Sequence, residues 1–386
     1  MAQAILQFGT SRFLLAHVAL FVSQALQRGA AGQALGGICM VQTTLNPDSA
    51  LRVAALAAGG AYPVHIRGMQ HGEVVDQRLS ADAVQAALRA DADWPQVLQR
   101  VAFDAQVIVS NTADRGYQLD ARDTDAALTA VRAAKPGGAP SPPHSFPVKL
   151  LVLLHHRWKL NPQAPLTLFP CELIERNGDT LRDLLTTLAQ DGALPEDFIA
   201  WLRGHCVWAN SLVDRIVSEA LHPVGAVAEP YALWAVENQP RLQLPCRHES
   251  IMLTDDLAHY ARLKLFLLNG GHSFLAERWL HGPRPADATV MQAMHDPLRR
   301  AELEALWRDE MLPVFAALGQ HGAALAYLVE LRERLLNPFL VHRLEEIAHH
   351  HAQKKQRRFA PLCLLAEQML PGLQQPRLRA ALSSPH

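Results

Sequence analysis

The segment Ala4-Ile-Leu-Gln-Phe-Gly-Thr-Ser-Arg-Phe-Leu-Leu-Ala-His17 decides how the chain begins to fold. Its first five residues form a short, mostly apolar run, which predicts a buried strand. A turn, Gly9-Thr-Ser-Arg-Phe13, comes next, and apolar residues then recur at helical spacing from Leu14 to Leu26. A strand, a glycine-containing turn and a helix in this order are how a parallel α/β domain of the Rossmann type begins.

The turn is the first candidate binding site, because free N–H groups at a helix N-terminus bind the pyrophosphate of a dinucleotide. The generic G-x-G-x-x-G pattern is incomplete, since Ser11 and Leu14 replace its second and third glycines. As a motif the turn is weak, and an ordinary strand–turn–helix explains it as well. The candidate cofactor-binding residues here are Phe8, Gly9, Thr10, Ser11 and Arg12.

Two further apolar runs, Ile38–Gln42 and Val107–Thr112, end in polar residues. Ligands of open α/β sheets bind beyond the carboxyl ends of the strands. We expect Gln42 to contact the adenosine ribose, with neither an acid for a 2′-hydroxyl nor an arginine for a 2′-phosphate beside it. An ordinary polar turn explains the end of the second run about equally well. The candidates for the nicotinamide edge are Ser110, Asn111 and Thr112.

The stretch Lys264-Leu-Phe-Leu-Leu-Asn-Gly-Gly-His272 lies in an apolar region with helical spacing. At about 100° per residue, Lys264, Asn269 and His272 fall within an arc of roughly 140°. A desolvated amine can exchange a proton near neutral pH, and an amide and an imidazole can hydrogen-bond a charged oxygen. Taken alone, however, the stretch favours a purely structural interpretation. Lys264 would then extend to water, Asn269-Gly270 would be a turn and His272 would be a core histidine.

Two acidic residues are candidates for binding a substrate. Glu172 ends the apolar run that begins at Leu166, although an acid at a strand end can simply face solvent. Asp214 lies within the apolar segment Asn210–Ile216, and buried charges are rarely left unpaired. Asp214 therefore needs a partner, which could be a substrate hydroxyl, Lys264 or a structural arginine.

Basic residues near the C-terminus suggest one further binding group. Arg334 could hold a carboxylate through two parallel hydrogen bonds, or pair on a helix surface with Glu330 or Glu333. The run His349–His351 is a poor metal site, because consecutive helical residues point about 100° apart. We expect no metal, and we read this run as part of a solvated basic face with Lys354, Lys355, Arg357 and Arg358.

The rest of the chain predicts a β-hairpin over Tyr62–Arg67 and Glu73–Arg78, a last strand over Tyr231–Val236, and a Pro/Gly-rich surface loop over Lys135–Ser145. Helices are expected over Ala81–Leu88, Trp94–Ala102, Thr254–Leu275, Ala301–Met311, Ala323–Leu336 and Pro338–His350. The expected fold is therefore a Rossmann-like α/β domain, residues 1–247, followed by a mainly α-helical domain, residues 248–386.

These motifs together resemble the long-chain, zinc-independent mannitol and polyol dehydrogenase family. Lys-x4-Asn-x2-His resembles its active-site signature, and residues 8–17 are similar to its F-G-x-G-R-F-x-R-A-H opening, with Leu15 in place of an arginine. The segment Pro170–Leu181 looks most like the uronate branch, the tagaturonate reductases (altronate oxidoreductases). Polyol-oxidising relatives carry an asparagine where this chain has Leu173.

The resemblance implies an NAD-dependent, zinc-independent oxidoreductase that interconverts tagaturonate and altronate, with NADP the less favoured cofactor. Lys264 would be the acid/base, and Asn269 and His272 would hold the oxygen that carries charge. The substrate-binding residues would be Asp214, Asn210, Arg334 and Glu172. Two alternatives stay open: a polyol (mannitol-type) or fructuronate dehydrogenase, and a catalytically degenerate protein that binds a nucleotide or sugar acid.

Composition agrees with a two-domain globular protein, since 49% of the 386 residues are hydrophobic and 19% are charged. The net charge of −1 gives no electrostatic reason to expect nucleic acid or anionic membrane as a partner. The five scattered cysteines fit a reducing cytoplasm. We expect no membrane span and no signal peptide, a small-molecule substrate, and a monomer or weak homo-oligomer.

Overall fold

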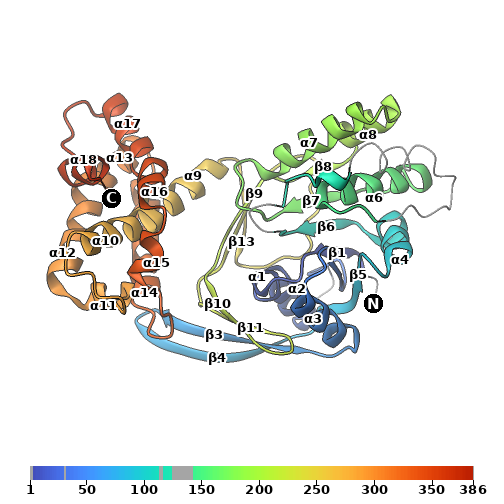
Figure 1. Ribbon diagram of the computed structural model, residues 1–386, viewed down its shortest axis with the longest axis horizontal. Coiled ribbons are helices and arrows are strands. Elements are labelled where there is room, and N and C mark those ends of the chain that lie inside the picture. The colour runs from blue at the N-terminus through green and yellow to red at the C-terminus, as the bar shows by residue number, and fades with distance from the viewer. Residues whose placement is uncertain (1–2, 30–31, 113–115, 124–141, 386) are drawn as a thin grey trace. The chain divides into compact units, whose positions relative to one another are not determined.

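The computed structural model describes residues 3–29, 32–112, 116–123 and 142–385 (Figure 1). Most of the loop expected over Lys135–Ser145 lies outside the described residues. The chain forms two compact units, each assembled from separate segments. The first comprises Met1–His65, Arg78–Ala228 and Ala232–Leu257, and the second comprises Ile66–Gln77, Glu229–Tyr231 and Ala258–His386. The domain boundary near residue 248 stays a prediction.

The first unit is organised around a parallel sheet in the order β5-β2-β1-β6-β7-β8. Strand β1 lies between β2 and β6, pairing Ile5 with both Ile38 and Val107. Strands β2 and β5 therefore lie on one side of β1, and β6, β7 and β8 lie on the other. The point where the strand order reverses is where open α/β sheets bind ligands. The strands are β1 (Ile5–Phe8), β2 (Ile38–Gln42), β5 (Val84–Arg89), β6 (Val107–Ser110), β7 (Thr167–Pro170) and β8 (Val207–Trp208).

Helices cover both faces of this sheet, which explains why its strands read as almost continuous apolar runs (Figure 1). Alternate strand residues such as Leu6, Phe8 and Ile108 join one buried cluster with Leu151 and Phe198 from the covering helices. The Rossmann-like α/β fold expected from the sequence is thereby confirmed. The helices are α2 (Val18–Gln27) and α3 (Pro47–Ala57) on one side, and α4 (Trp94–Gln99), α6 (Phe146–Leu160), α7 (Asn177–Asp191) and α8 (Glu196–Gly204) on the other.

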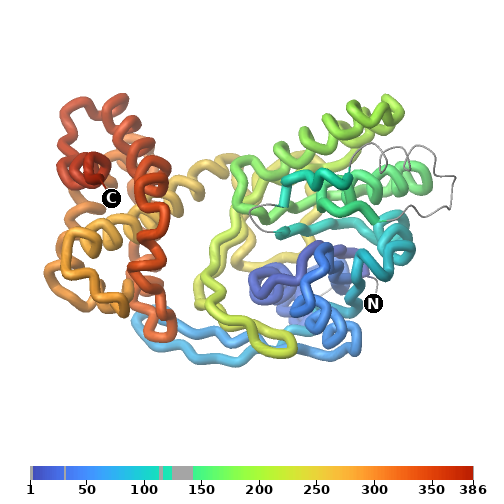
Figure 2. The backbone as a smooth tube through the Cα atoms, viewed as in Figure 1, coloured from blue at the N-terminus to red at the C-terminus, as the bar shows by residue number. Residues whose placement is uncertain are grey.

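Two smaller sheets complete the strands, with the orders β10-β11-β3-β4 and β13-β12-β9. The hairpin of β3 (Tyr62–Gln70) and β4 (Glu73–Ala81) can be followed in Figure 2, with β11 (Ala226–Ala228) paired to β3. The remaining strands are β9 (Ser211–Asp214), β10 (Val217–Ala220), β12 (Leu233–Glu237) and β13 (Ile251–Thr254).

Two of the predicted elements are wrong here. The helix expected over Ala81–Leu88 is strand instead, because pairing of β5 with β2 overrides the helical preference of an alanine-rich segment. The strand near Tyr231 is not the last one, since β13 pairs in parallel with β12. Both errors arise because sheet pairing between distant segments leaves little trace in local sequence.

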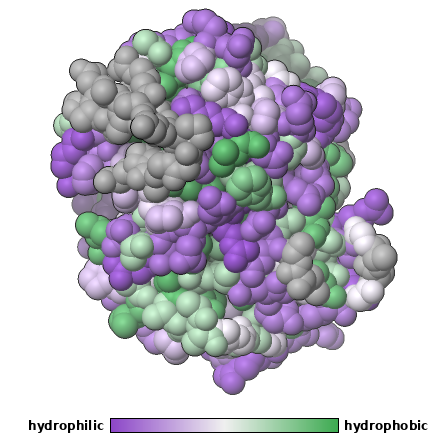
Figure 3. All heavy atoms as spheres, turned by 90° about the vertical axis from the view of Figure 1, so that its right-hand side faces the viewer, coloured by the Kyte–Doolittle hydropathy of each residue, from purple (hydrophilic) through white to green (hydrophobic). Residues whose placement is uncertain are grey.

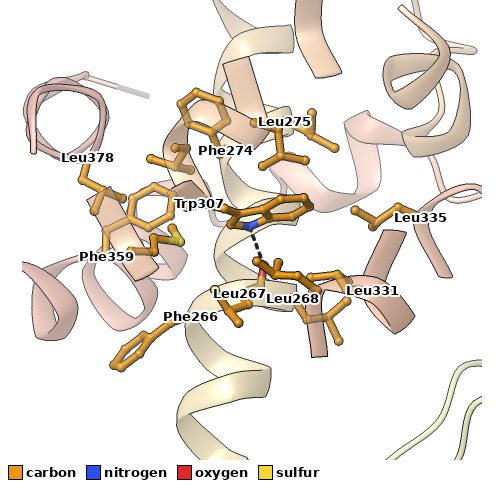
Figure 4. Packing of buried hydrophobic residues seen from close by; sticks show 14 of the residues in the cluster. Phe266, Leu267, Leu268, Phe274, Leu275, Trp307, Leu331, Leu335, Phe359 and Leu378 are labelled. Carbon is orange, nitrogen blue, oxygen red and sulfur yellow. Dashed lines mark hydrogen bonds between the residues drawn. The ribbon is translucent and has the colours of Figure 1, made fainter. Parts of the chain in front are cut away.

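The second unit is mainly helical, as expected, and it encloses its own apolar core. Figure 4 shows part of that core, with Trp307 surrounded by leucine and phenylalanine side chains. Short π-helical turns, Leu263–Asn269 and Trp307–Met311, interrupt two of the helices. The α-helices are α9 (Leu257–Arg262), α10 (Gly270–Leu280), α11 (Val290–His295), α12 (Pro297–Leu306), α13 (Leu312–Ala317), α14 (His321–Leu335), α15 (Leu344–Ala348), α16 (His351–Arg358), α17 (Ala360–Met369) and α18 (Pro376–Ser383).

The helix expected over Pro338–His350 is mostly wrong, because only α15 forms within it. The side chain of Asn337 accepts a hydrogen bond from the backbone N–H of Phe339, 2.9 Å away, and so shapes a turn. His350 ends the segment with a positive φ of 54°, which breaks the helix before α16 begins.

The basic face expected over residues 349–358 is also wrong for its buried members. His351 and Lys355 lie one turn apart on α16 and point into the second unit. Both contact the buried carboxylate of Glu277, at 2.7 Å and 3.2 Å respectively. A buried acid on α10 supplies the counter-charge that lets these basic residues leave water.

On the face of the first unit in Figure 3, hydrophilic and hydrophobic side chains are interspersed. None of the helices among the described residues is both long enough and apolar enough to cross a bilayer.

Burial of His17 predicts an acid-sensitive first unit. Burial lowers the pKa of His17 from 6.5 to about 3, so the unfolded chain binds the proton that the folded protein excludes. Between these two values the free energy of unfolding should fall by about 1.4 kcal/mol per pH unit as the pH decreases. His17→Gln keeps a side-chain donor but does not titrate. Urea unfolding from pH 4 to 7 should show a shallower pH dependence for this variant, and equal slopes would contradict the prediction.

Candidate functional site

The turn after β1 requires glycine. Gly9 has φ of +113°, and a Cβ built there would lie 2.6 Å from the carbonyl oxygen of Asn111. Its N–H donates to the carbonyl of Val41 at 3.0 Å, while the N–H of Asn111 donates to the carbonyl of Phe8 at 3.1 Å. The ends of β1, β2 and β6 are thus drawn together where the sheet reverses direction. Because the backbone segments lie this close together, a side chain at position 9 would also block the approach of a ligand.

Ser11, which replaces the second glycine of the generic motif, caps a helix. Its hydroxyl accepts a hydrogen bond from the N–H of Leu14 at 3.3 Å, at the start of α1 (Arg12–Leu15). The single helix expected from Leu14 is split, because Ala16 and His17 separate α1 from α2. The Ser11 side chain is therefore engaged with its own helix.

A guanidinium lies beside the turn. Arg52 of α3 donates a hydrogen bond from Nη1 to the carbonyl oxygen of Thr10, 2.6 Å away. Thr10 itself is buried and Arg12 is exposed. A positive group, the N–H groups at the start of α1 and a glycine turn form a donor set that suits a pyrophosphate. The residues present therefore fit a dinucleotide.

His17, which ends the opening motif, is a core residue. It is fully buried, its Nε2 donates to the carbonyl of Leu233 at 3.0 Å, and its ring stacks on Phe13 at 4.7 Å. Arg215 closes the same region by donating to the carbonyl of Ala16 at 2.7 Å. The histidine therefore fixes the helix that follows the turn.

Gln42 holds the loop that follows β2. Its side-chain amide is buried and donates to the carbonyls of Thr44 and Asn46 at 2.6 and 3.0 Å. Asn46 in turn caps α3 by accepting from the N–H of Ser49. The contact of Gln42 with a ribose stays a prediction.

The carboxylate of Glu172 brings together the residues expected at the nicotinamide edge. Oε2 accepts from the hydroxyl of Ser110 at 3.1 Å, and Oε1 accepts from the N–H and hydroxyl of Thr112 at 3.0 and 2.9 Å. Glu172 is only 3% exposed, so the alternative of an acid facing solvent is wrong. Burial raises the pKa of this carboxyl.

Two neighbours complete this cluster. Asn111 donates to the carbonyl of Cys171 at 2.9 Å, which ties β6 to β7. Tyr117 points its hydroxyl at Glu172, 3.5 Å away, and donates to the carbonyl of Asn177 at 3.1 Å. Sequence analysis missed Tyr117, because it lies 55 residues from Glu172 in no motif.

Asn210 is already bound by the protein. Its amide nitrogen donates to Glu237 at 2.7 Å and to Asp179 at 3.1 Å, and its oxygen accepts from the N–H of Asp179. Asp214 is buried at the end of β9, opposite Leu233 in the sheet, and its charge acts on His17. Their contacts with a substrate stay predictions.

The three candidate catalytic residues of the second unit lie on one interrupted helix. Lys264 and Asn269 are half-buried and belong to the π-helical turn, while His272 is buried in α10. The hydrogen bonds of a π-helical turn join residues i and i+5. These two residues therefore lie nearer to the same face of the helix than they would in an α-helix. The arc of roughly 140° expected for an α-helix therefore does not describe Lys264 and Asn269.

The two glycines of this helix differ in their surroundings. A Cβ on Gly271 would lie 3.2 Å from the Trp307 ring, whereas one on Gly270 would make only ordinary contacts. Trp307 is fully buried, and its indole N–H donates to the carbonyl of Leu267 at 3.4 Å (Figure 4). Gly271 therefore lets the Trp307 ring approach the helix backbone closely.

His272 packs against a second histidine that sequence analysis did not single out. The rings of His272 and His342 lie 4.7 Å apart, centroid to centroid, at an interplanar angle of 70°. Burial lowers the pKa of His342. His342 comes from the non-helical segment before α15, which was expected to be helix.

Arg334 is bound to a carboxylate of the protein itself. Its Nε and Nη2 donate to the two oxygens of Glu229 at 3.0 and 2.8 Å, and both side chains are almost fully buried. Its guanidinium also lies 4.2 Å from the ring centroid of Tyr231. The expected surface pair with Glu330 or Glu333 is therefore wrong. The two parallel hydrogen bonds that could bind a substrate carboxylate are made instead to Glu229, within the second unit.

The comparisons with known proteins cover both parts of the chain. Residues 3–245 match the model of the mannitol dehydrogenase Rossmann domain, and residues 256–382 match that of the mannitol dehydrogenase C-terminal domain. Similar curated proteins include altronate oxidoreductases from Halalkalibacterium halodurans (29% identity, 93% of this chain and 70% of the relative) and Bacillus subtilis (27%, 90% and 71%). That of Klebsiella pneumoniae is 30% identical, over 84% of this chain and 68% of the relative.

Two solved structures share the fold. D-sorbitol dehydrogenase in substrate-free form has a TM-score of 0.79 and covers 99% of this chain and 80% of its own. Mannitol 2-dehydrogenase of Pseudomonas fluorescens, solved as a ternary complex with NAD and D-mannitol, has a TM-score of 0.70 and covers 99% and 78%. Both are 18% identical to this chain.

Removing the Glu172 carboxylate should destabilise the first unit. Glu172→Leu leaves the three donors of Ser110 and Thr112 without their acceptor, and each unpaired buried donor costs about 1–3 kcal/mol. Glu172→Gln keeps one acceptor oxygen and the shape of the side chain. Urea unfolding should show a loss of roughly 2–5 kcal/mol for Glu172→Leu and a much smaller loss for Glu172→Gln. Equal losses would mean that shape, not hydrogen bonding, matters here.

Alanine should stabilise the protein at Gly270 but not at Gly271. Gly270→Ala gains helix propensity, about 1 kcal/mol, without a steric penalty. Gly271→Ala pushes against the buried Trp307 ring, so strain should cancel that gain or exceed it. Thermal unfolding of the two variants provides the measurement. A Gly271→Ala protein as stable as Gly270→Ala would show that the ring can move away.

Proposed function

Because the chain belongs to the mannitol dehydrogenase family, and is an oxidoreductase that acts on CH–OH groups, we propose that it interconverts tagaturonate and altronate with NAD. The observation that carries this proposal is the similarity to altronate oxidoreductases over 84–93% of the chain. The exposed Leu173, three residues after β7, also supports it, because a leucine cannot stabilise an alkoxide as the polyol enzymes' asparagine does.

The cofactor-binding residues are proposed to be those at the carboxyl ends of β1, β2 and β6. The turn at Gly9 and the N–H groups of α1 would hold the pyrophosphate, with Arg52 adding positive charge beside them. Gln42 would lie at the ribose, where the residues that follow it, Thr43 and Thr44, offer no positive charge to a 2′-phosphate, which favours NAD over NADP. When bound, the nicotinamide supplies the hydride to the carbonyl carbon or accepts it in the reverse direction.

Lys264 is proposed to give a proton to the carbonyl oxygen as the hydride adds to the carbon. The ketone thereby becomes an alcohol, with one proton from the enzyme and one hydride from the cofactor. Asn269 and His272 would hydrogen-bond the same oxygen as negative charge develops on it. In altronate oxidation Lys264 takes the proton back.

The remaining site residues are proposed to place the rest of the substrate. Asp214 would accept hydrogen bonds from substrate hydroxyls. Arg334 would place positive charge towards the substrate, although its Nε and Nη2 are bound to Glu229 and its Nη1 donates to the hydroxyl of Tyr327 at 3.3 Å. Asn210 and Glu172 hold neighbouring protein groups, so we propose that they contact the substrate only at the margin of the site.

The cytoplasm is the proposed compartment. All five cysteines are free and buried, and thiols of this kind persist in reducing surroundings. A monomer or weak homo-oligomer remains the expected assembly.

Turnover with a panel of ketoses tests the proposal. NADH oxidation should be saturable with tagaturonate, weaker with fructuronate and weakest with fructose, and NADPH should be the poorer donor. Lys264→Met should lower kcat by about 10²- to 10⁴-fold while NADH still binds, as measured by fluorescence titration. Lys159→Met, an exposed change on α6, is the matched control.

Other outcomes of this assay discriminate the alternatives. Preferred turnover of fructose would identify a polyol enzyme, and preferred turnover of fructuronate would identify the related uronate enzyme. NADH binding without turnover of any member of the panel would indicate a catalytically degenerate protein.

A further inference from the structure

The π-helical turn Leu263–Asn269, directly before α10, distorts the helix at the place where two of the proposed catalytic residues lie. Such turns are rare, and they cost regular helical hydrogen bonding. The turn begins immediately before Lys264 and ends at Asn269, so both proposed catalytic side chains leave from it. Lys264 and Asn269 are residues i and i+5, so the turn brings them nearer to the same face of the helix. Its shape therefore affects how both side chains approach the same substrate oxygen.

Two side chains from distant parts of the second unit donate hydrogen bonds to carbonyl groups of this turn. The indole of Trp307 reaches the carbonyl of Leu267 (Figure 4), and Arg358 reaches that of Asn269 at 3.1 Å. The same nitrogen of Arg358 donates to the hydroxyl of Ser273 at 2.8 Å. Arg358 thus ties the last residue of the π-helical turn to the first turn of α10.

The surroundings of Arg358 point to a specific role. Among the residues that the structure describes, no carboxylate lies within ion-pair distance of it, although burial lowers its pKa to about 10. Arg358 is half-buried, and withdrawing a charge even partly from water without a counter-charge is costly. The next residue, Arg357, is exposed. The carbonyl of Asn269 and the hydroxyl of Ser273 are the polar groups that compensate this burial.

We propose that Arg358 is a positioning residue, which fixes the π-helical turn so that Asn269 and Lys264 are held in register for the reaction. It acts through the backbone of Asn269 and does not itself touch the substrate. This inference rests on the proposed function, because it assigns Arg358 a part in the same reaction.

Kinetics of three variants test the proposal. Arg358→Ala should lower kcat by about 10- to 100-fold, because small displacements of catalytic groups are costly. The KM for the ketose and the affinity for NADH should change by only about twofold, since ground-state binding uses other groups. Arg358→Lys should recover part of kcat, because an ammonium can donate to both oxygens. Arg357→Ala is the matched control and should behave as wild type.

Chemical rescue separates positioning from folding. Millimolar guanidinium should raise kcat of Arg358→Ala several-fold and leave Arg357→Ala unchanged, because the small cation can occupy the vacated position. A kcat of Arg358→Ala equal to wild type would overturn the proposal. So would a loss of kcat accompanied by an equal loss of NADH binding and of thermal stability.

Hydrogen exchange provides a readout that does not depend on turnover. In Arg358→Ala, peptides covering Leu263–Ser273 should exchange about tenfold faster than in wild type, while peptides from α7 should be unchanged. Unchanged exchange in that segment would overturn the proposal. If wild-type protein turns over none of the ketoses, the proposed function fails, and the exchange experiment still shows whether Arg358 holds the turn.

Discussion

The packing of Gly9 against the carbonyl of Asn111 is the constraint on which the arrangement of the strand ends at the carboxyl edge of the sheet depends. The backbone adopts a positive φ there and passes too close to β6 for any side chain. This contact fixes the ends of β1 and β6 at the point where the sheet reverses direction. Glu172 then gathers Ser110 and Thr112 around one buried carboxylate. A glycine and an acid therefore define the edge at which a dinucleotide is proposed to bind.

In the second unit a glycine likewise allows close packing, on the helix that carries the proposed catalytic residues. Gly271 lets the Trp307 ring lie against the backbone, and the indole N–H reaches back to the turn that precedes it. Arg358 holds the same turn from another helix. Apolar side chains pack around this helix, while the two donors bond carbonyl groups of the turn. In the proposed reaction the shape of the turn matters, because transition-state stabilisation depends on where donors point.

Several charged residues that look available in the sequence are engaged within the fold. Arg334 binds Glu229, and Lys355 with His351 binds Glu277, in both cases away from water. Removing one partner of such a pair leaves a buried charge, so these pairs are expensive to break. A substitution in one of these pairs would therefore disturb the packing of neighbouring elements as well as any contact with a substrate.

The sequence by itself determined the Rossmann-type sheet and the helical second part, because apolar periodicity and the Gly9 turn are local signals. It misjudged Ala81–Leu88 and Pro338–His350, where sheet pairing and an asparagine turn override local preference. Only the tertiary structure decided that Ser11 caps a helix, that the Glu172 carboxylate accepts hydrogen bonds from the end of β6, and that Arg358 donates to the carbonyl of Asn269. The last two depend on contacts between residues 60 or more positions apart, and such contacts are set by how helices and strands pack, which no local pattern encodes.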